Sequence, residues 1–307
     1  MLMQRIITAL VLAVVVILAV FELPANYFSL FIAIVTLGGA WEWLALTNVD
    51  KTTKKILFFA ALIIPMLGVT YWTVLLEVLS EAMEWPEIKD YSDALEWFVI
   101  APVLFWLLAM IVIRQAAPQL LKMEFKPSFQ AFVGWLVLLA AWMFMTKLRA
   151  YYGSGMVLYL LLLIWAADIS AYFVGKKWGK DKLAPEVSPG KTLQGMYGAL
   201  GAAIVCGIGF WVYGVLSSEE PGEATNEALR FLDELVFTDM LVLSVFTVLI
   251  SVYGDLLFSL VKRRKGVKDS GRLLPGHGGI LDRVDSLIAA TPFFYAGILL
   301  IGRIFYS

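Results

Sequence analysis

Apolar runs of membrane-spanning length recur along most of the chain. A bilayer hydrocarbon core about 30 Å thick needs about 20 mostly apolar residues in a helix. Nine segments meet this need, at residues 6–22, 27–46, 56–76, 97–113, 129–146, 156–175, 196–216, 237–261 and 286–306. We interpret the first as a retained span rather than a signal peptide, because it is long and lacks a small-residue cleavage site. The pattern predicts an all-α polytopic integral membrane protein with about nine transmembrane helices.

The charges between these segments predict an orientation. Basic residues dominate the segments after the second, fourth, sixth and eighth spans, whereas residues 77–96 and 217–239 are acidic. Cytoplasmic loops are enriched in Lys and Arg. We therefore expect a cytoplasmic N-terminus, a C-terminus outside, and cytoplasmic loops at 176–195 and 262–285. The short segment after the fifth span, which carries Lys147 and Arg149, is the one exception.

The composition agrees with a membrane protein. Hydrophobic residues make up 61% of the chain and charged residues 16%, against about 45–50% and about 25% in soluble domains. A single cysteine excludes an internal disulfide scaffold, and a net charge of -1 gives no overall basic field for nucleic acid. Before about residue 150 the spans are almost purely apolar, whereas after it carboxylates enter the spans and glycines cluster in the loops. We therefore divide the chain into N-terminal transmembrane helices, residues 1–150, and a C-terminal catalytic transmembrane domain, residues 151–307.

Two aspartates inside the predicted spans are candidates for function, because charge within a bilayer is costly. Asp168 and Asp255 each precede the end of a span by about two turns, roughly 10 Å below the cytoplasmic surface. Their matching depth predicts that they converge on one site, although each could instead pair separately with a nearby basic residue. We interpret Glu42, between two tryptophans, as an interfacial carboxylate, and Asp239 as a solvated residue at the outer end of its span.

The segment 262–285 combines three features of a phosphate-binding site. A basic cluster comes first, a Gly/Pro-rich turn follows, and Asp282 and Asp285 begin the last span. Glycines let backbone amides approach an anion closely, and carboxylates beside a polyphosphate-binding surface indicate Mg²⁺. We expect His277, the single histidine, to donate a hydrogen bond to phosphate. A topology signal that also binds anionic lipid head groups would explain the basic cluster but not Asp269, Asp282 and Asp285.

The segment 176–195 is a second candidate phosphate contact. Ser188 and Thr192 offer hydroxyls and Lys191 offers charge, just ahead of the seventh span, whose N-terminus carries the positive end of a helix dipole. Pro185 occupies the position where a Walker A loop has its first glycine, so this is not such a loop. A capped, positively charged turn is the alternative.

Residues 259–285 resemble the signature of the phosphatidate cytidylyltransferases, also called CDP-diacylglycerol synthases. The matching positions are Ser259, Lys262, Arg263, Lys268, Asp269, Gly271, His277, Gly278, Gly279, Asp282, Arg283 and Asp285. The stretches 168–175 and 188–195 also resemble the family pattern, whereas residues 1–150 match mainly in their number of spans.

The resemblance implies that CTP and phosphatidic acid react to give CDP-diacylglycerol and pyrophosphate in an Mg²⁺-dependent reaction, with K⁺ as a candidate second ion. It implies metal-ligand roles for Asp255 and Asp282, with Asp285 and Asp168 as nearby supporting carboxylates. We expect CTP, phosphatidic acid and membrane lipids as partners, no nucleic acid, and a homodimer as the candidate assembly. The expected location is the inner, cytoplasmic membrane of the cell, with the site facing the cytoplasm.

The expected chemistry needs no Ser or Cys nucleophile, because phosphate is itself a competent nucleophile. Catalysis would rest on positioning and on charge neutralisation. We assign the catalytic set Asp255, Asp282, Asp285, Asp168 and Lys262. Phosphate contacts are expected from Lys262, Arg263, Lys268, His277 and Arg283, with a second contact from Ser188, Lys191 and Thr192. The rest of the substrate-binding set is Ser259, Asp269, Gly278 and Gly279.

Three other functions stay open at this point. The first is a CTP-dependent enzyme acting on another lipid, such as a polyprenol kinase or a CDP-archaeol-type synthase. The second is an ion-coupled transporter that uses Asp168 and Asp255, although no internal repeat is evident and these charges lie toward one face. The third is a purely structural membrane partner, which would not require carboxylates beside a glycine turn.

Overall fold

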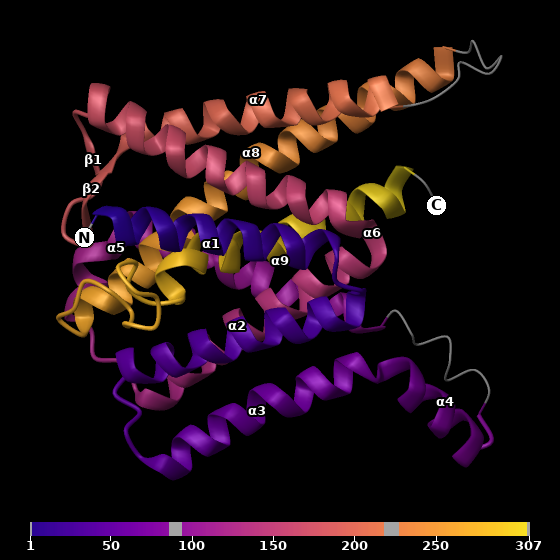
Figure 1. The fold of residues 1–307 in the computed structure, drawn as a ribbon, viewed down its shortest axis with the longest axis horizontal. Coiled ribbons are helices and arrows are strands. Elements are labelled where there is room, and N and C mark those ends of the chain that lie inside the picture. Colours follow the sequence, from indigo (N-terminus) through magenta and orange to yellow (C-terminus); the bar gives the residue numbers. More distant parts are fainter. Residues whose placement is uncertain (1, 86–93, 218–226, 306–307) are drawn as a thin grey trace.

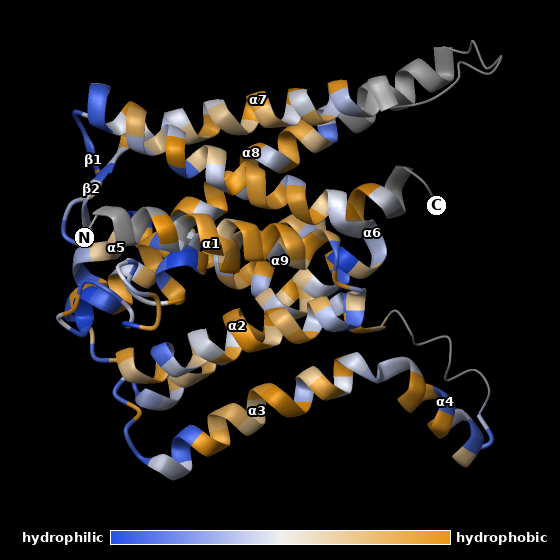
Figure 2. Ribbon diagram, in the orientation of Figure 1, coloured by the Kyte–Doolittle hydropathy of each residue, from blue (hydrophilic) through white to orange (hydrophobic). Residues whose placement is uncertain are grey.

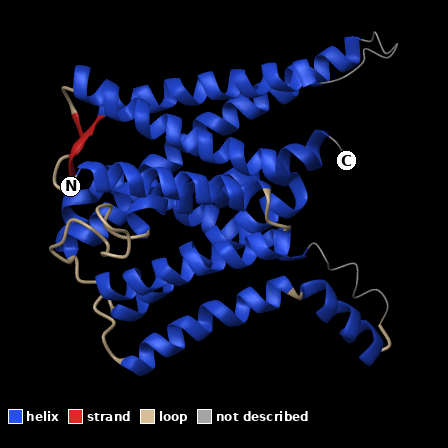
Figure 3. Ribbon diagram, viewed as in Figure 1, coloured by secondary structure: helices blue, strands red, loops and turns tan. Residues whose placement is uncertain are grey.

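The computed structural model describes residues 2–85, 94–217 and 227–305. Helices dominate these ranges (Figure 3). They are α1 (Leu2–Phe21), α2 (Ala25–Leu46), α3 (Thr52–Thr70), α4 (Trp72–Ala82), α5 (Ile100–Lys122), α6 (Pro127–Trp178), α7 (Leu193–Ser217), α8 (Glu227–Arg264) and α9 (Leu281–Phe305). Two short strands, β1 (Lys182–Ala184) and β2 (Ser188–Thr192), pair antiparallel and form a hairpin that the hydrophobic pattern does not predict.

Long apolar helices make this a multi-pass membrane protein. Within the described residues, α2, α3, α5, α6, α7, α8 and α9 contain stretches long and apolar enough to cross a bilayer, and α1 has a shorter apolar stretch, Leu10–Phe21. The predicted all-α polytopic fold is confirmed. The number of crossings and the orientation of the termini stay predictions, and the acidic segments 77–96 and 217–239 lie partly outside the described residues.

The fifth and sixth predicted spans are joined without the expected loop. Residues 147–152 are helical, and α6 runs from Pro127 to Trp178 with one break at Gly153. The backbone of Gly153 has φ +80° and ψ -179°, a conformation that glycine adopts without steric cost because it has no Cβ. The chain therefore changes direction at a single residue, and α6 consists of two helices in sequence. The division of the chain at residue 150 stays a prediction. Residue 150 lies inside α6, so this helix belongs to both parts of the divided chain.

Lys147 and Arg149, the exception in the charge pattern, lie within the protein. Arg149 donates hydrogen bonds to the carbonyl oxygens of Val20 (3.1 Å) and Leu23 (3.2 Å), where α1 ends. Lys147 is buried, with its ammonium group 5.2 Å from the ring centroid of Tyr151. The Arg149 guanidinium therefore satisfies a carbonyl group that the end of α1 leaves without a helical partner. The interpretation of these residues as loop charges is wrong, because both lie within α6.

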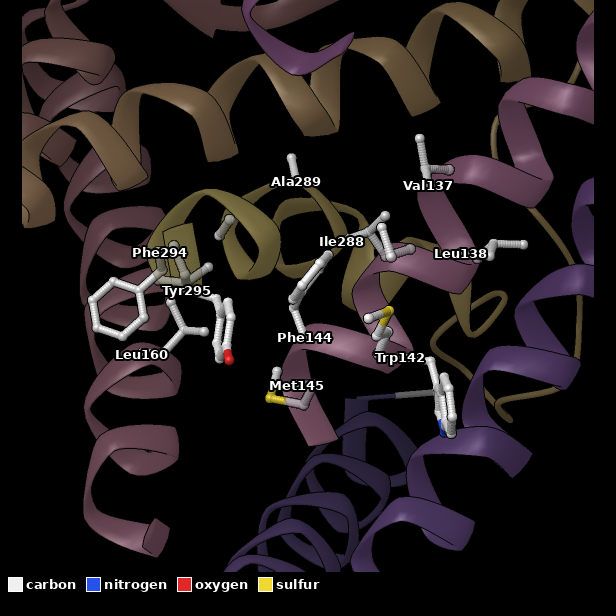
Figure 4. Packing of buried hydrophobic residues seen from close by; sticks show 14 of the residues in the cluster. Val137, Leu138, Trp142, Phe144, Met145, Leu160, Ile288, Ala289, Phe294 and Tyr295 are labelled. Carbon is white, nitrogen blue, oxygen red and sulfur yellow. The ribbon is translucent and has the colours of Figure 1, made fainter. Parts of the chain in front are cut away.

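The core is built around α6 and α9 (Figure 4). Trp142 and Phe144 of α6 and Phe294 and Tyr295 of α9 are almost completely buried. The ring centroids of Phe144 and Tyr295 are 5.1 Å apart, a typical spacing for a favourable aromatic pair. This packing fixes α9, whose first turns carry Asp282 and Asp285.

The polar connections gather at one end of the bundle. Figure 1 shows the β1–β2 hairpin, the segment between α8 and α9 and the N-terminal end of α1 together at the left, and Figure 2 shows hydrophilic residues concentrated there. The two segments singled out from the sequence, 176–195 and 262–285, therefore meet at the same end. The middle of the bundle is hydrophobic.

Candidate active site

Two helices approach unusually closely beneath these segments. A Cβ atom on Gly254 of α8 would collide with the Cβ of Ala289 in α9 and would lie 3.2 Å from the carbonyl oxygen of Asp285. Only glycine therefore allows this approach of α8 to α9. The next residue in α8 is Asp255, so the contact brings the two helices together where each carries an aspartate.

Asp255 is held by residues from two elements. Its Oδ2 forms an ion pair with Nζ of Lys191 at 2.7 Å. Its Oδ1 accepts a hydrogen bond from Oγ of Ser259, one turn along α8, at 3.2 Å. Lys191 lies in β2, and its ammonium group also donates to the carbonyl oxygen of Val252 (3.3 Å). Through Lys191, the hairpin therefore contacts α8. The side chains of Lys191 and Asp255 stay partly exposed.

Asp282 forms a second ion pair. Its Oδ1 lies 2.6 Å from Nζ of Lys262, and its Oδ2 accepts hydrogen bonds from the backbone amides of Ser270 (2.7 Å) and Gly279 (3.0 Å). The side chains of Lys262 and Asp282 are only 11% and 7% exposed. Both oxygens of the buried Asp282 carboxylate therefore have a charged or hydrogen-bonding partner, which a buried ion requires.

Two further carboxylates, those of Asp285 and Asp168, interact electrostatically with the charges of these two ion pairs. Asp285 is buried and accepts a hydrogen bond from the amide of Ser286 (2.9 Å). Its charge interacts with Asp255, Lys262 and Lys191. Asp168 on α6 is exposed, and its charge interacts with Asp255 and Lys191. The predicted convergence of Asp168 and Asp255 stays a prediction, which the electrostatic interaction of their charges favours.

The cluster holds more carboxyl groups than ammonium groups. Four carboxylates, those of Asp168, Asp255, Asp282 and Asp285, face two ammonium groups, those of Lys191 and Lys262. Like charges that are packed together repel more strongly as solvent is excluded. Such a cluster favours the binding of a further cation, which would neutralise the excess.

The glycine turn is shaped around Asp282. Gly276 and Gly278 have positive φ, +73° and +83°. The amide of Leu274 donates to the carbonyl oxygen of Gly278 at 2.9 Å, which closes the turn. A Cβ on Gly278 would lie 2.8 Å from Oδ2 of Asp282 and 3.4 Å from the Cβ of Asp269. A side chain at Gly278 would therefore both strain the backbone and displace Asp282.

Several basic residues expected to bind phosphate are exposed near this turn, and within the described part of the chain they form no ion pair with the four carboxylates. Arg263 donates to the carbonyl oxygens of Val187 (3.2 Å) and Val267 (3.3 Å). Arg283 donates to the carbonyl oxygen of His277 (3.1 Å), and Lys268 is exposed. Their positions leave these cations accessible from the end of the bundle, as a soluble anion would need.

Other expected contacts have structural roles here. Thr192 is buried, and its Oγ1 accepts a hydrogen bond from the amide of Gly195 (3.1 Å), which caps the start of α7. Ser188 is half-buried in β2. His277 is half-buried, and its Nδ1 is a buried atom without a hydrogen-bond partner among the described residues. Among the described residues, these three side chains form no hydrogen bond to Asp255 or Asp282.

Glu42 is the main residue whose role the sequence pattern does not reveal. It is 2% exposed, and its carboxylate accepts hydrogen bonds from Oγ of Ser270 (2.8 Å) and from the amides of Ile280 and Leu281 (both 2.9 Å). The last two belong to the start of α9, where amides lack helical partners and a negative charge is favourable. The interpretation of Glu42 as an interfacial carboxylate is wrong, because it is a buried anchor for the glycine turn. The only signal in the sequence is a charge within an apolar span.

Asp239 also differs from its expected solvated state. It is half-buried, and its Oδ2 is a buried atom that has no hydrogen-bond partner within the described part of the chain. It lies in α8, four turns from Asp255. It takes no part in the cluster.

Comparison with known proteins agrees with this site. Residues 3–301 match the model of the cytidylyltransferase family. The chain is 35% identical to the phosphatidate cytidylyltransferase of Haemophilus influenzae, over 96% of this chain and 97% of that protein. It is also 35% identical to the phosphatidate cytidylyltransferase of Pseudomonas aeruginosa, over 96% of each chain. These matches extend over the N-terminal helices as well as the site. The chain belongs to the cytidylyltransferase family.

Proposed function

We propose that this protein transfers the cytidylyl group of CTP to phosphatidic acid and so produces CDP-diacylglycerol and pyrophosphate. Family membership and the two relatives matched over nearly their full length support the proposal. In the structure, the main support for this proposal is the presence of two ion pairs, Lys191–Asp255 and Lys262–Asp282. The segments that contribute to them gather at the polar end of an otherwise apolar bundle. This placement lets a lipid phosphate in the membrane meet a nucleotide from the aqueous side.

The reaction is a displacement at phosphorus. An oxygen of the phosphatidate phosphate forms a bond to the α-phosphorus of CTP, and the bond from that phosphorus to the bridging oxygen breaks, so pyrophosphate leaves. The attacking phosphate is already nucleophilic, so the protein supplies position and charge. Lys191 and Lys262 would exchange a carboxylate partner for phosphate, and Arg263, Lys268 and Arg283 supply exposed positive charge.

The carboxylates fit a hard divalent cation. In this proposal Asp255 and Asp282 hold Mg²⁺, Asp285 and Asp168 support it, and K⁺ is a candidate second ion. No group of three His, Cys, Asp or Glu residues arranged for a metal occurs among the described residues, and Mg²⁺ is usually bound by one or two carboxylates together with phosphates and water. When bound, the ion would neutralise charge on the phosphates of CTP.

The same arrangement supports a proposal for the location of the protein. The basic segments 176–195 and 262–285 lie at one end of the bundle with the N-terminal end of α1, and basic loops favour the cytoplasmic side. The protein would therefore lie in the cytoplasmic membrane with its site toward the cytoplasm.

The direct test is a micelle assay with labelled CTP, phosphatidic acid and Mg²⁺. Wild-type protein and Asp50→Asn, which changes an exposed aspartate outside the cluster, should produce labelled CDP-diacylglycerol. Asp255→Asn, Asp282→Asn and chelated wild type should each lose at least about a hundredfold in rate, the scale of one lost electrostatic contact in catalysis. Turnover only with a different lipid acceptor, or none in folded protein, would refute the proposal.

A further inference from the structure

A large apolar cavity opens beside the glycine turn. It has a volume of about 530 Å³ and lies among α1, α2, α6 and α9, within the size range of ligand pockets in proteins. Its wall consists of aliphatic and aromatic side chains except for Gly39, two threonines, His277 and Arg283. No residue of the Asp168–Asp255 cluster lines it.

The cavity has one polar end and a long apolar shaft. Arg283 and His277 belong to the glycine turn and the first turn of α9, and Arg283 directly follows Asp282. From Arg283 the wall continues along α9 to Thr291, a distance of roughly 12 Å at the rise of an α-helix. The shaft therefore leads from the edge of the ion-pair cluster toward the middle of the apolar bundle.

The polar end is suited to an anion. The guanidinium of Arg283 is accessible, with a single hydrogen bond to the carbonyl oxygen of His277. Nδ1 of His277 is buried and has no partner within the described residues. His277 and Arg283 both line the cavity, so a guanidinium and an imidazole stand beside its apolar wall at this end.

We infer that this cavity is the subsite for an acyl chain of the phosphatidate substrate, with the lipid phosphate held at the end formed by His277 and Arg283. The inference rests on the proposed function, because it names where that substrate lies. An apolar shaft joined to a cationic end matches a phospholipid with one chain in the shaft. It does not match a nucleotide, whose polar base would be buried without partners.

Chain-length dependence tests the subsite. Ala141 of α6 lines the shaft, and Ala141→Phe would shorten it; Ala150→Phe places the same ring on the exposed surface of the same helix and is the matched control. We expect Ala141→Phe to raise the KM for dioleoyl phosphatidate at least about tenfold, because each methylene kept out of the cavity weakens binding about fourfold. The KM for dioctanoyl phosphatidate, and all values for Ala150→Phe, should change less than about twofold. Equal effects of Ala141→Phe on both lipids would overturn the inference.

A second measurement does not depend on turnover. Phosphatidate with a photoactivatable diazirine in the middle of one acyl chain should cross-link to residues 12–20, 28–39 and 138–165, and excess unlabelled phosphatidate should prevent it. Cross-links confined to the exposed faces of α3 and α5 would overturn the subsite even if the enzyme is active. Cross-links in the cavity with no transfer from CTP would uphold the lipid site and refute the proposed reaction instead.

Discussion

The carboxylate of Glu42 in α2 lies 2.9 Å from the backbone nitrogen of Leu281, the first residue of α9. A side chain from the N-terminal part of the chain therefore fixes the start of the helix that carries Asp282 and Asp285. The same carboxylate holds Ser270, whose amide donates to Asp282. This relationship explains how the first helices, which contribute none of the clustered carboxylates, contribute to the site.

Loss of the Glu42 carboxylate should impair the site. Glu42→Ala leaves three donors without a partner, and at about 1.5–3 kcal/mol for each hydrogen bond to a charged group we expect a destabilisation of several kcal/mol. Glu42→Gln keeps the volume and should lower kcat more than it changes the KM for CTP. Glu42→Asp should recover part of the rate.

The matched control is Glu22→Gln, since Glu22 is exposed near the end of α1. Thermal unfolding in detergent and steady-state kinetics would be measured for all four variants. A rate for Glu42→Gln equal to that of the wild type would show that the anchor is dispensable.

The buried pair Lys262–Asp282 should behave as a coupled unit. Lys262→Met and Asp282→Asn each leave one buried partner uncompensated, and we expect about 3–5 kcal/mol of destabilisation for each. The double variant should be more stable than the sum of the two losses predicts, because neither charge is left alone. Its activity should stay lost, since both groups are needed for phosphate and cation. Additive losses of stability would contradict a direct pairing in the folded protein.

The close approach of α8 and α9 should depend on Gly254. Gly254→Ala places a methyl group against Ala289, and overpacking of this kind costs about 1–3 kcal/mol. It would also separate Asp255 from Asp285 and lower the rate. Gly209→Ala in α7 is the control, because nothing lies within 4 Å of a Cβ there, and alanine in a helix is favoured by roughly 0.5–1 kcal/mol. Unfolding temperature and rate would be compared, and equal behaviour of the two variants would refute the packing argument.

Orientation can be measured with single cysteines. Cys206 is the only native cysteine, so Cys206→Ser provides the background. Glu186→Cys and Arg272→Cys, both exposed at the polar end, should react with a membrane-impermeant maleimide in inverted vesicles but not in spheroplasts. Met83→Cys, exposed at the end of α4, should show the opposite pattern. Labelling of Glu186→Cys and Arg272→Cys from opposite sides would contradict a shared cytoplasmic face.

The all-α polytopic fold was predictable from sequence because an apolar run about 20 residues long has few other stable environments. The matching depth of Asp168 and Asp255 along their helices was also predictable, since depth along a helix follows from counting residues. The continuation of α6 through residues 147–152 was not, because Lys147 and Arg149 resemble loop charges until their partners in the fold are known. Glu42 was missed for a related reason. Its hydrogen bonds reach residues more than two hundred positions away, and no local pattern records such contacts.

The central claim is the transfer of a cytidylyl group, and the position of the label in CTP tests it most directly. Purified protein would be given phosphatidic acid and Mg²⁺ with CTP labelled at the α-phosphate or, in a parallel reaction, at the γ-phosphate. The account predicts that the α-label enters the lipid while the γ-label is released as pyrophosphate in equal amount. Entry of the γ-label into lipid would show a CTP-dependent kinase and contradict the account.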